Sequence, residues 1–314
     1  MSKAFSKLRI GTRGSKLAMV QTHTVAGLLR ARHPGLEIEI VEILTSGDWK
    51  PEHGETRLSE SEGGKGLFAR EIEKAMLDGR VDCGVHSMKD MASFLPEGLV
   101  IDHMLLREDP RDAFLANDCK TLGELKTGAV MGTSSLRRQA MLLAKRPDLK
   151  IVSLRGNVPT RIEKLRAGKV DATMLALSGL KRLGLAHEVA SVLSVEEMVP
   201  AAGQGAVGIE IRQDDAAVRA LFDPLNHEET LLRVNAERAA LQVLDGSCHT
   251  PIGAHAVLEG DKMSLHVLVA APDGMRSYEE RSAGGVTSVE QARALGKALG
   301  EKLKVRVPPD VLAK

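Results

Sequence analysis

A repeated strand and helix pattern is the feature of this chain that most restricts its fold. Gly11-Thr12 and Gly132-Thr133 each end a predicted strand directly before a predicted helix, and the stretches DGRVDCGV and AGKVDATM each lead from a helix into a strand. Apolar strands that alternate with helices are typical of a mostly parallel sheet covered by helices. The sequence therefore predicts two similar α/β domains, with a ligand cleft where the strands end.

A third, smaller domain is expected after about residue 226, where the pattern changes. A helix over ETLLRVNAERAALQVL is followed by strands in GAHAVLE and MSLHVLVAAP and by a last helix. A chain of 314 residues also exceeds the size of one ordinary hydrophobic core. The predicted units are an N-terminal α/β domain of residues 1–105 plus 206–225, a second α/β domain of residues 106–205, and a C-terminal α+β domain of residues 226–314.

The charge balance limits the classes of partner. The chain has 43 basic and 42 acidic side chains, so it carries almost no net field that would attract nucleic acid. Its first residues contain no apolar run typical of a signal peptide, and no stretch approaches the ~20 apolar residues of a membrane span. We therefore expect a cytoplasmic protein that binds neither nucleic acid nor membrane, and whose basic sites are local.

The three cysteines are expected to be free thiols with different environments. Cys83 lies in an apolar strand and is predicted to be inert core, whereas Cys119 lies in a polar loop. Cys248 lies on a Gly-Ser turn in LQVLDGSCHTPIGAH, which favours an exposed attachment or reaction site. Cys248 and His249 would supply at most two metal ligands, so no metal site is expected.

Two glycine-rich stretches resemble the sequence motifs of nucleotide-binding loops, but neither meets the full requirements of such a loop. GQGAVG, at residues 203–208, matches a dinucleotide fingerprint, but a loop precedes it and a strand follows it, whereas the fingerprint needs a strand before and a helix after. GGKG, at residues 63–66, lacks the first glycine and the hydroxyl residue of a phosphate loop. It ends the polar segment 46–66, which is better explained as a lid.

The stretch GTSSLRRQ predicts an anion site at the start of a helix. Thr133 and Ser135 lie where backbone N–H groups and the helix dipole favour an anion, and Arg137 and Arg138 add positive charge. Since consecutive helical side chains point about 100° apart, we expect one arginine to face the cleft and the other to reach round its rim or form a structural pair. A solvated basic helix start is the alternative.

Further arginines follow strand ends in both α/β domains. Arg13 and Ser15 lie in GTRGSK, Arg155 and Arg161 flank a turn in LRGNVPTR, and Arg182 lies in GLKRLG. A guanidinium group pairs with a carboxylate through two parallel hydrogen bonds. The set therefore predicts a ligand that carries several carboxylates.

The strand that ends in GVHSMKD places a charged pair where chemistry is expected. Asp90 is a candidate general acid or base and Lys89 a candidate carboxylate clamp, and an ordinary surface ion pair is the alternative. His86 lies on the strand itself, so we expect it to be a packing residue.

The motifs GGKGLF, HSMKD, REDPRDAF, GTSSLRRQ, SLRGNVPTR, LSGLKRLG, GQGAVGIE and GSCHTPIG occur in one order over nearly the whole chain, which thereby resembles the porphobilinogen deaminase family. The resemblance implies three domains, of which the first two are similar to periplasmic binding proteins, and a covalent dipyrromethane cofactor in the cleft. It further implies a monomeric enzyme of tetrapyrrole and heme biosynthesis. The implied reaction is the head-to-tail condensation of four porphobilinogen molecules into hydroxymethylbilane with release of ammonia.

The resemblance also implies a role for each motif residue. Cys248 would carry the cofactor through a thioether, and Asp90 would bind pyrrole N–H groups, assist the loss of ammonia and stabilise the resulting cation. The remaining cofactor-binding residues would be Lys89, Thr133, Ser135, Arg137, Arg138 and Arg155. The substrate-binding residues would be Arg13, Ser15, Lys65, Phe68, Arg155, Arg161, Arg182 and Gln204.

Two departures from the family pattern and one rival function accompany the resemblance. Met91-Ala92 stands where the family often has Val-Pro, so the backbone there is less constrained. Ser61 stands where many members have a lysine, so one carboxylate contact is either absent or made by Lys50 or Lys65. The rival is a non-catalytic polycarboxylate-binding protein of the periplasmic type.

Overall fold

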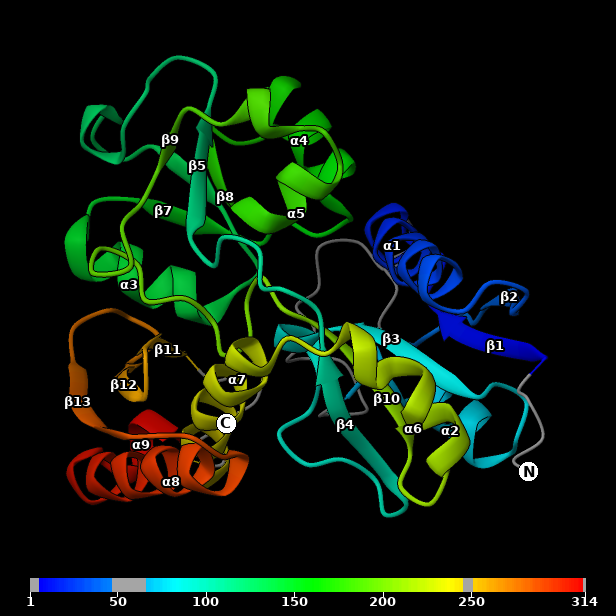
Figure 1. The fold of residues 1–314 in the computed structure, drawn as a ribbon. Helices are drawn as coiled ribbons and strands as arrows, with labels where there is room; N and C mark the ends of the chain where they lie inside the picture. The colour runs from blue at the N-terminus through cyan, green and yellow to red at the C-terminus, as the bar shows by residue number, and fades with distance from the viewer. Residues whose placement is uncertain (1–5, 47–65, 245–250, 313–314) are drawn as a thin grey trace.

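The structure is a computed structural model that describes residues 6–46, 66–244 and 251–312. These residues form two five-stranded sheets and one three-stranded sheet, each with its own helices (Figure 1). Among them, no helix is both long enough and apolar enough to cross a membrane.

The first sheet has the strand order β2-β1-β3-β10-β4. Strand β1 pairs in parallel with β2 and β3, and β10 pairs antiparallel with β3 and β4. One apolar cluster joins α1 and α6 to the sheet, and another joins α2 to it. The elements are β1 (Lys7–Thr12), α1 (Lys16–Arg32), β2 (Glu37–Glu42), α2 (Arg70–Leu77), β3 (Cys83–Ser87), β4 (Leu99–Met104), β10 (Val207–Arg212) and α6 (Ala216–Phe222).

The second sheet repeats this arrangement with the order β7-β6-β8-β5-β9. Strand β6 pairs in parallel with β7 and β8, and β5 pairs antiparallel with β8 and β9. Because only one strand of each sheet is reversed, both sheets are mostly parallel, and the predicted likeness of the two α/β units is confirmed. The elements are β5 (Asp112–Ala116), β6 (Val130–Gly132), α3 (Leu136–Lys145), β7 (Lys150–Val152), α4 (Val158–Arg166), β8 (Ala172–Ala176), α5 (Leu177–Arg182) and β9 (Ser191–Val192).

The third unit is an antiparallel sheet of order β11-β12-β13 with two long helices against it (Figure 1). Gly296 of α8 lies so close to α7 that a Cβ there would be 2.1 Å from the Ala236 carbonyl oxygen. The elements are α7 (Glu228–Val243), β11 (Ile252–Glu259), β12 (Lys262–Ala270), β13 (Ser277–Gly285), α8 (Val289–Arg306) and α9 (Pro309–Leu312). The fold class is as expected from the sequence, and the domain boundaries stay a prediction.

Some elements escape the sequence pattern. Strands β4, β5, β9 and β13 and helices α5 and α6 are absent from the sequence-based expectation. Helices α5 and α6 have six and seven residues, and β9 has two. Elements this short do not show a recognisable hydrophobic periodicity in the sequence. Four short 3₁₀ turns complete the described part of the chain: η3 (Met88–Asp90), η4 (Leu122–Glu124), η5 (Ala186–Glu188) and η6 (Asp223–Leu225).

Two chain segments cross between the sheets and lie side by side. One joins β4 to β5 and the other joins β9 to β10. The Glu108 amide donates to the Gly205 carbonyl oxygen at 3.2 Å, and Arg107 Nε donates to the Gln204 carbonyl oxygen at 2.9 Å. Gly205 has a φ of +91° and is followed by β10 rather than by a helix. Gly205 therefore serves a close backbone approach, and the strand expected after GQGAVG is observed.

We expect Gly205→Ala to destabilise the fold by at least ~3 kcal/mol, because a Cβ would meet the Glu108 carbonyl oxygen at 2.3 Å while φ stays positive. Gly168→Ala is the matched control, since Gly168 has a φ of +67° and nothing within 4 Å of a built Cβ. That control should cost only about 1 kcal/mol. Urea unfolding measures both changes, and equal losses in the two variants would contradict the close approach.

Candidate active site

The polar residues singled out from the sequence gather where strands of both α/β sheets end. Ser15 follows β1 and caps α1, with its Oγ accepting from the Ala18 amide at 3.3 Å. Lys89 and Asp90 lie in the turn η3 directly after β3. Ser135 follows β6 and caps α3, with its Oγ accepting from the Arg138 amide at 3.4 Å. Each serine thus caps a helix that begins directly after a strand end.

Arg137 and Arg138 converge on one buried carboxylate, that of Asp112 at the start of β5. Arg137 Nη1 lies 2.8 Å from Asp112 Oδ2, and Arg138 Nη2 lies 2.7 Å from Asp112 Oδ1. All three residues are almost fully buried. The structural pair that we expected of one arginine is therefore made by both, because Asp112 attracts both guanidinium groups. The alternative of a solvated basic helix start is wrong, since both side chains are buried.

This cluster keeps an excess of positive charge inside the protein. Burial alone would raise the pKa of Asp112, but the charges of Arg137 and Arg138 outweigh it and hold that pKa well below its usual range. Burial lowers the pKa of Arg137, although it stays cationic at neutral pH. Two guanidinium groups thus face one carboxylate, so the cluster is one negative charge short of balance.

Gln204 ties the same carboxylate to the crossing segments. Its Nε2 donates to Asp112 Oδ1 at 3.1 Å and to the Pro110 carbonyl oxygen at 2.6 Å. The Gln204 side chain is almost fully buried. The predicted contact of Gln204 with a substrate stays a prediction, and its observed partners give it a role in holding the crossing segments together.

Lys89 of the first sheet lies within electrostatic reach of this second-sheet cluster. Burial is the main cause that lowers the pKa of Lys89 to about 8, with Arg138 and Arg137 adding to the shift and Asp90 and Asp112 opposing it. Because burial destabilises the charged form of Lys89, a carboxylate placed beside it would stabilise that form strongly. Lys89 and the arginine pair thus approach the same space from two sheets.

Asp90 is half-buried in the turn, which the Met91 amide closes by donating to the Met88 carbonyl oxygen at 3.3 Å. In residues 6–46, 66–244 and 251–312, its carboxylate makes no hydrogen bond or ion pair. His86, four residues earlier, is buried as expected, with its Nε2 2.9 Å from Glu210 Oε2. Within these ranges the Asp90 acceptor oxygens are thus without a partner, and its catalytic role stays a prediction.

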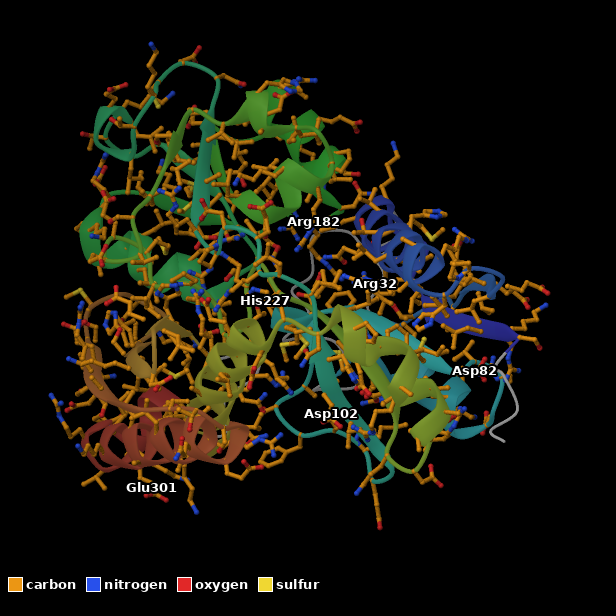
Figure 2. The ribbon with its side chains drawn as sticks, viewed as in Figure 1. Arg32, Asp82, Asp102, Arg182, His227 and Glu301 are labelled. Atoms are coloured by element: carbon orange, nitrogen blue, oxygen red, sulfur yellow. The ribbon has the colours of Figure 1, made fainter. Side chains whose placement is uncertain are left out.

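The arginines of the first and second sheets have distinct supports. The guanidinium carbon of Arg13 lies 4.1 Å from the centre of the Phe68 ring, which is a cation–π contact. Arg161 Nε donates to the Gly156 carbonyl oxygen at 2.8 Å, and Arg155 is buried after β7. Arg182, at the end of α5, donates to the Gly205 carbonyl oxygen at 2.7 Å (Figure 2). The set surrounds the crossing segments.

Two predicted site residues, Cys248 and Lys65, lie outside the described residues, as do Ser61, Lys50 and most of the predicted lid. The chain on each side of Cys248 is described. Helix α7 ends at Val243 before it, and the Pro251 carbonyl oxygen after it accepts from the Ala270 amide at 3.0 Å. The segment with Cys248 is thus attached to the C-terminal sheet at one end and to α7 at the other.

Sequence reasoning missed the buried ion pair of Arg107 with Glu237. Arg107 Nη1 lies 2.7 Å from Glu237 Oε1, and both side chains are almost fully buried. Glu237 also accepts from the amides of Gly203 at 2.7 Å and Ala256 at 2.8 Å. The pair joins the crossing segments to the C-terminal unit. A charged residue in the apolar run of α7 was the available signal.

Across the described ranges, no group of acidic, histidine or cysteine side chains could hold a metal.

Comparisons with known proteins agree with the site. Residues 8–220 match the family model "Porphobilinogen deaminase, dipyromethane cofactor binding domain", and residues 231–305 match "Porphobilinogen deaminase, C-terminal domain". The chain is 49% identical over 310 residues to the porphobilinogen deaminase of Geobacter sulfurreducens, covering 99% of this chain and 95% of that one.

Solved structures of binding proteins are more distantly similar. The methionine-binding protein MetQ is 16% identical, with a TM-score of 0.45, over 72% of this chain and 92% of that one. A YaeC-family lipoprotein of Enterococcus faecalis is 12% identical, with a TM-score of 0.43, over 72% of this chain and 93% of that one.

We expect Asp112→Asn to lower the free energy of unfolding by about 3–5 kcal/mol, because it leaves two buried guanidinium groups without a counter-charge. The matched control is Asp310→Asn, which removes the same charge from an exposed pair with Arg276 and should change the free energy of unfolding little. Denaturant unfolding at neutral pH compares them. Similar small losses would show that the Asp112 cluster does not stabilise the cleft.

Proposed function

The chain belongs to the porphobilinogen deaminase family and condenses porphobilinogen head to tail into hydroxymethylbilane on a covalent dipyrromethane cofactor, and we propose how its own residues do so. The observation that carries the proposal is the buried arginine pair on Asp112, whose charges act on Lys89, the residue before Asp90 in the turn after β3. The rival, a non-catalytic polycarboxylate-binding protein, is set aside by family membership over nearly the whole chain.

The residues of the cleft fit a cofactor that carries carboxylates. Arg137 and Arg138 share one counter-charge, and the cost of burying Lys89 as a cation falls when a carboxylate approaches. We assign cofactor binding to these three residues with Thr133, Ser135 and Arg155. When bound, the dipyrromethane supplies the terminal pyrrole carbon to which the first substrate is joined.

Asp90 is the proposed catalytic residue. Its unpaired carboxylate accepts hydrogen bonds from pyrrole N–H groups, and it holds the proton that accompanies the departing amine as ammonia. Its negative charge then stabilises the cation that the substrate becomes. The turn η3 presents this carboxylate at the end of β3, between the two α/β sheets.

Cys248 is the proposed tether, and a thioether there keeps the primer attached through every condensation. The substrate side chains, acetate and propionate, are assigned to Arg13, Ser15, Arg155, Arg161 and Arg182, with Gln204, Phe68 and Lys65 closing the site. In this assignment each carboxylate meets a guanidinium group or a helix N-terminus. We further propose that the protein acts as a cytoplasmic monomer without nucleic-acid or membrane partners, for which the family resemblance is the support.

The function is tested by mass and turnover together. Intact-protein mass spectrometry of the purified chain should show an adduct that Cys248→Ser abolishes, and the wild-type protein should convert porphobilinogen to hydroxymethylbilane. Asp90→Ala should keep the fold but lose at least ~10³-fold in kcat, since one group supplies both proton transfer and charge stabilisation. An unmodified and inactive wild-type chain would contradict the function, and near-normal turnover of Asp90→Ala would contradict the role of Asp90.

A pH dependence follows from the lowered pKa of Lys89, which is a cation below about 8 and neutral above it. Carboxylate binding by the cofactor-free Cys248→Ser protein should therefore be strong at pH 7 and weaken about tenfold by pH 9.5. Calorimetric titration with porphobilinogen measures the affinity. Lys89→Arg, in the same background, keeps its charge and should remove the decline. An equal decline in both proteins would assign the titration to another group.

A further inference from the structure

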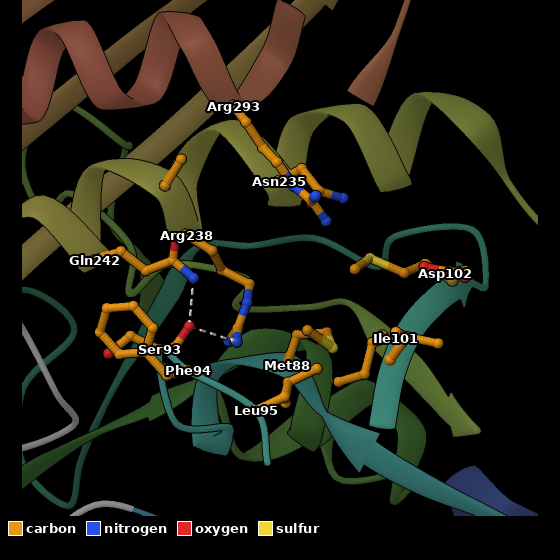
Figure 3. A pocket seen from close by; sticks show the side chains of 13 residues that line it. Met88, Ser93, Phe94, Leu95, Ile101, Asp102, Asn235, Arg238, Gln242 and Arg293 are labelled. Atoms are coloured by element: carbon orange, nitrogen blue, oxygen red, sulfur yellow. Dashed lines mark hydrogen bonds between the residues drawn. The ribbon is translucent and has the colours of Figure 1, made fainter. Parts of the chain in front are cut away.

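The backbone directly after Asp90 is held by two side chains of α7. Arg238 Nη2 donates to the Ala92 carbonyl oxygen at 2.5 Å and makes a longer contact of 3.4 Å with that of Ser93. Gln242, one helical turn further, donates from Nε2 to the same Ser93 oxygen at 2.6 Å (Figure 3). Arg238 Nη1 also lies 3.4 Å from the Met91 carbonyl oxygen. Three successive carbonyl groups thus face one helix.

Packing holds this turn in part, because Met88 and Met91 are buried in one apolar cluster with Leu231 and Val234 of α7. A cavity of about 280 Å³ lies between the first sheet and α7, and Met88, the first residue of the Asp90 turn, is on its wall (Figure 3). Arg238, Asn235 and Arg293 line the opposite side. Side chains beside a void lose dispersion contacts on that side. The hydrogen bonds from α7 therefore add to the packing of Met91 in restraining the segment 91–93.

The charge on Arg238 makes this restraint stronger than neutral hydrogen bonds would. Burial lowers the pKa of Arg238 to about 10, so the group stays cationic at neutral pH. Within the described part of the chain, Arg238 has no carboxylate ion pair, and carbonyl oxygens are its hydrogen-bond partners. Hydrogen bonds from a cation are roughly twice as strong as neutral ones. The 91–93 carbonyl groups are therefore the hydrogen-bond partners of Arg238 there, and the charge of Glu210 also favours its cationic form.

The same helix leads to the proposed tether. Gln242 is the penultimate residue of α7, and the segment with Cys248 begins directly after the helix. Glu237, adjacent to Arg238, fixes α7 to the crossing segments through its buried pair with Arg107. Helix α7 is thus a rigid element that contacts the Asp90 segment with its side chains and continues into the chain that carries the cysteine.

We propose that Arg238 and Gln242 are positioning residues, which set the place of Asp90 relative to a primer attached at Cys248 by holding the carbonyl groups of residues 91–93 against α7. This inference rests on the proposed function and goes beyond it. Neither side chain is assigned a contact with substrate or cofactor. Their effect on the reaction passes through the backbone that follows Asp90, and a misplacement of about 1 Å can cost a factor of 10² in rate.

The first experiment separates positioning from folding. In Arg238→Met the donors are lost while the stem is kept, and we expect kcat for hydroxymethylbilane formation to fall about 100-fold, with KM changed less than threefold and full cofactor mass. Arg238→Lys should recover part of kcat, and Gln242→Met should show a smaller fall of about tenfold. Arg293→Met is the matched control, since Arg293 lines the same cavity but donates to Asn235, and its kcat should match wild type.

The second experiment restores the restraint by another route. Met91 has φ of −77° and ψ of 138°, which is the conformation that a following proline favours. Ala92→Pro, added to Arg238→Met, should therefore stiffen the segment and recover at least tenfold in kcat. A merely structural role predicts that Arg238→Met lowers the melting temperature and leaves kcat per folded, cofactor-loaded molecule near wild type.

The outcomes are distinct for the two proposals. A kcat of Arg238→Met within threefold of wild type would overturn the positioning role, and so would a loss that Ala92→Pro does not recover. If Arg238→Met does not fold, Arg238→Lys and Gln242→Met are compared with wild type by the same criterion. A wild-type chain that forms no hydroxymethylbilane would instead overturn the proposed function.

Discussion

The cleft depends on one buried carboxylate that holds two guanidinium groups. Asp112 fixes the start of β5, the first turn of α3 and, through Gln204, the crossing segments. Burying three charges is costly unless each is paired, and here the pairing is one negative charge short. The remaining positive charge faces the Lys89 and Asp90 turn. In the proposed function an acidic ligand completes this balance, so that the interaction which stabilises the fold would also select the ligand.

The positive charge of this protein is local. With 43 basic and 42 acidic side chains, the chain has almost no net charge, yet arginines collect at strand ends and crossing segments. Internal ion pairs outside this cluster, such as Arg107 with Glu237, neutralise other arginines. Within the described ranges, Asp90 has no hydrogen bond or ion pair at its carboxylate. In the proposed function the cations bind carboxylates, and Asp90 is the negative group beside which a cation develops.

The sequence predicted most of the fold that positions the site, because the relevant signals are local. The stretch GTSSLRRQ was predicted to begin a helix, and the structure confirms that α3 begins there, with Ser135 as its N-cap. Asp112 was not predicted, since its partners lie at least 25 residues away and no local pattern reports a pair of that separation. Nor could spacing reveal that Arg137 and Arg138 share it. The hydrogen bonds of Arg238 to the Asp90 segment are hidden for the same reason.

A crystal structure of the protein as purified tests the central claim most directly. The account predicts continuous density from the sulfur of Cys248 to a two-pyrrole group, with its carboxylates against Lys89, Arg137 and Arg138 and its ring nitrogens within hydrogen-bond distance of Asp90. Density that leaves Cys248 unmodified, or that directs an attached group away from the arginine pair, would contradict it.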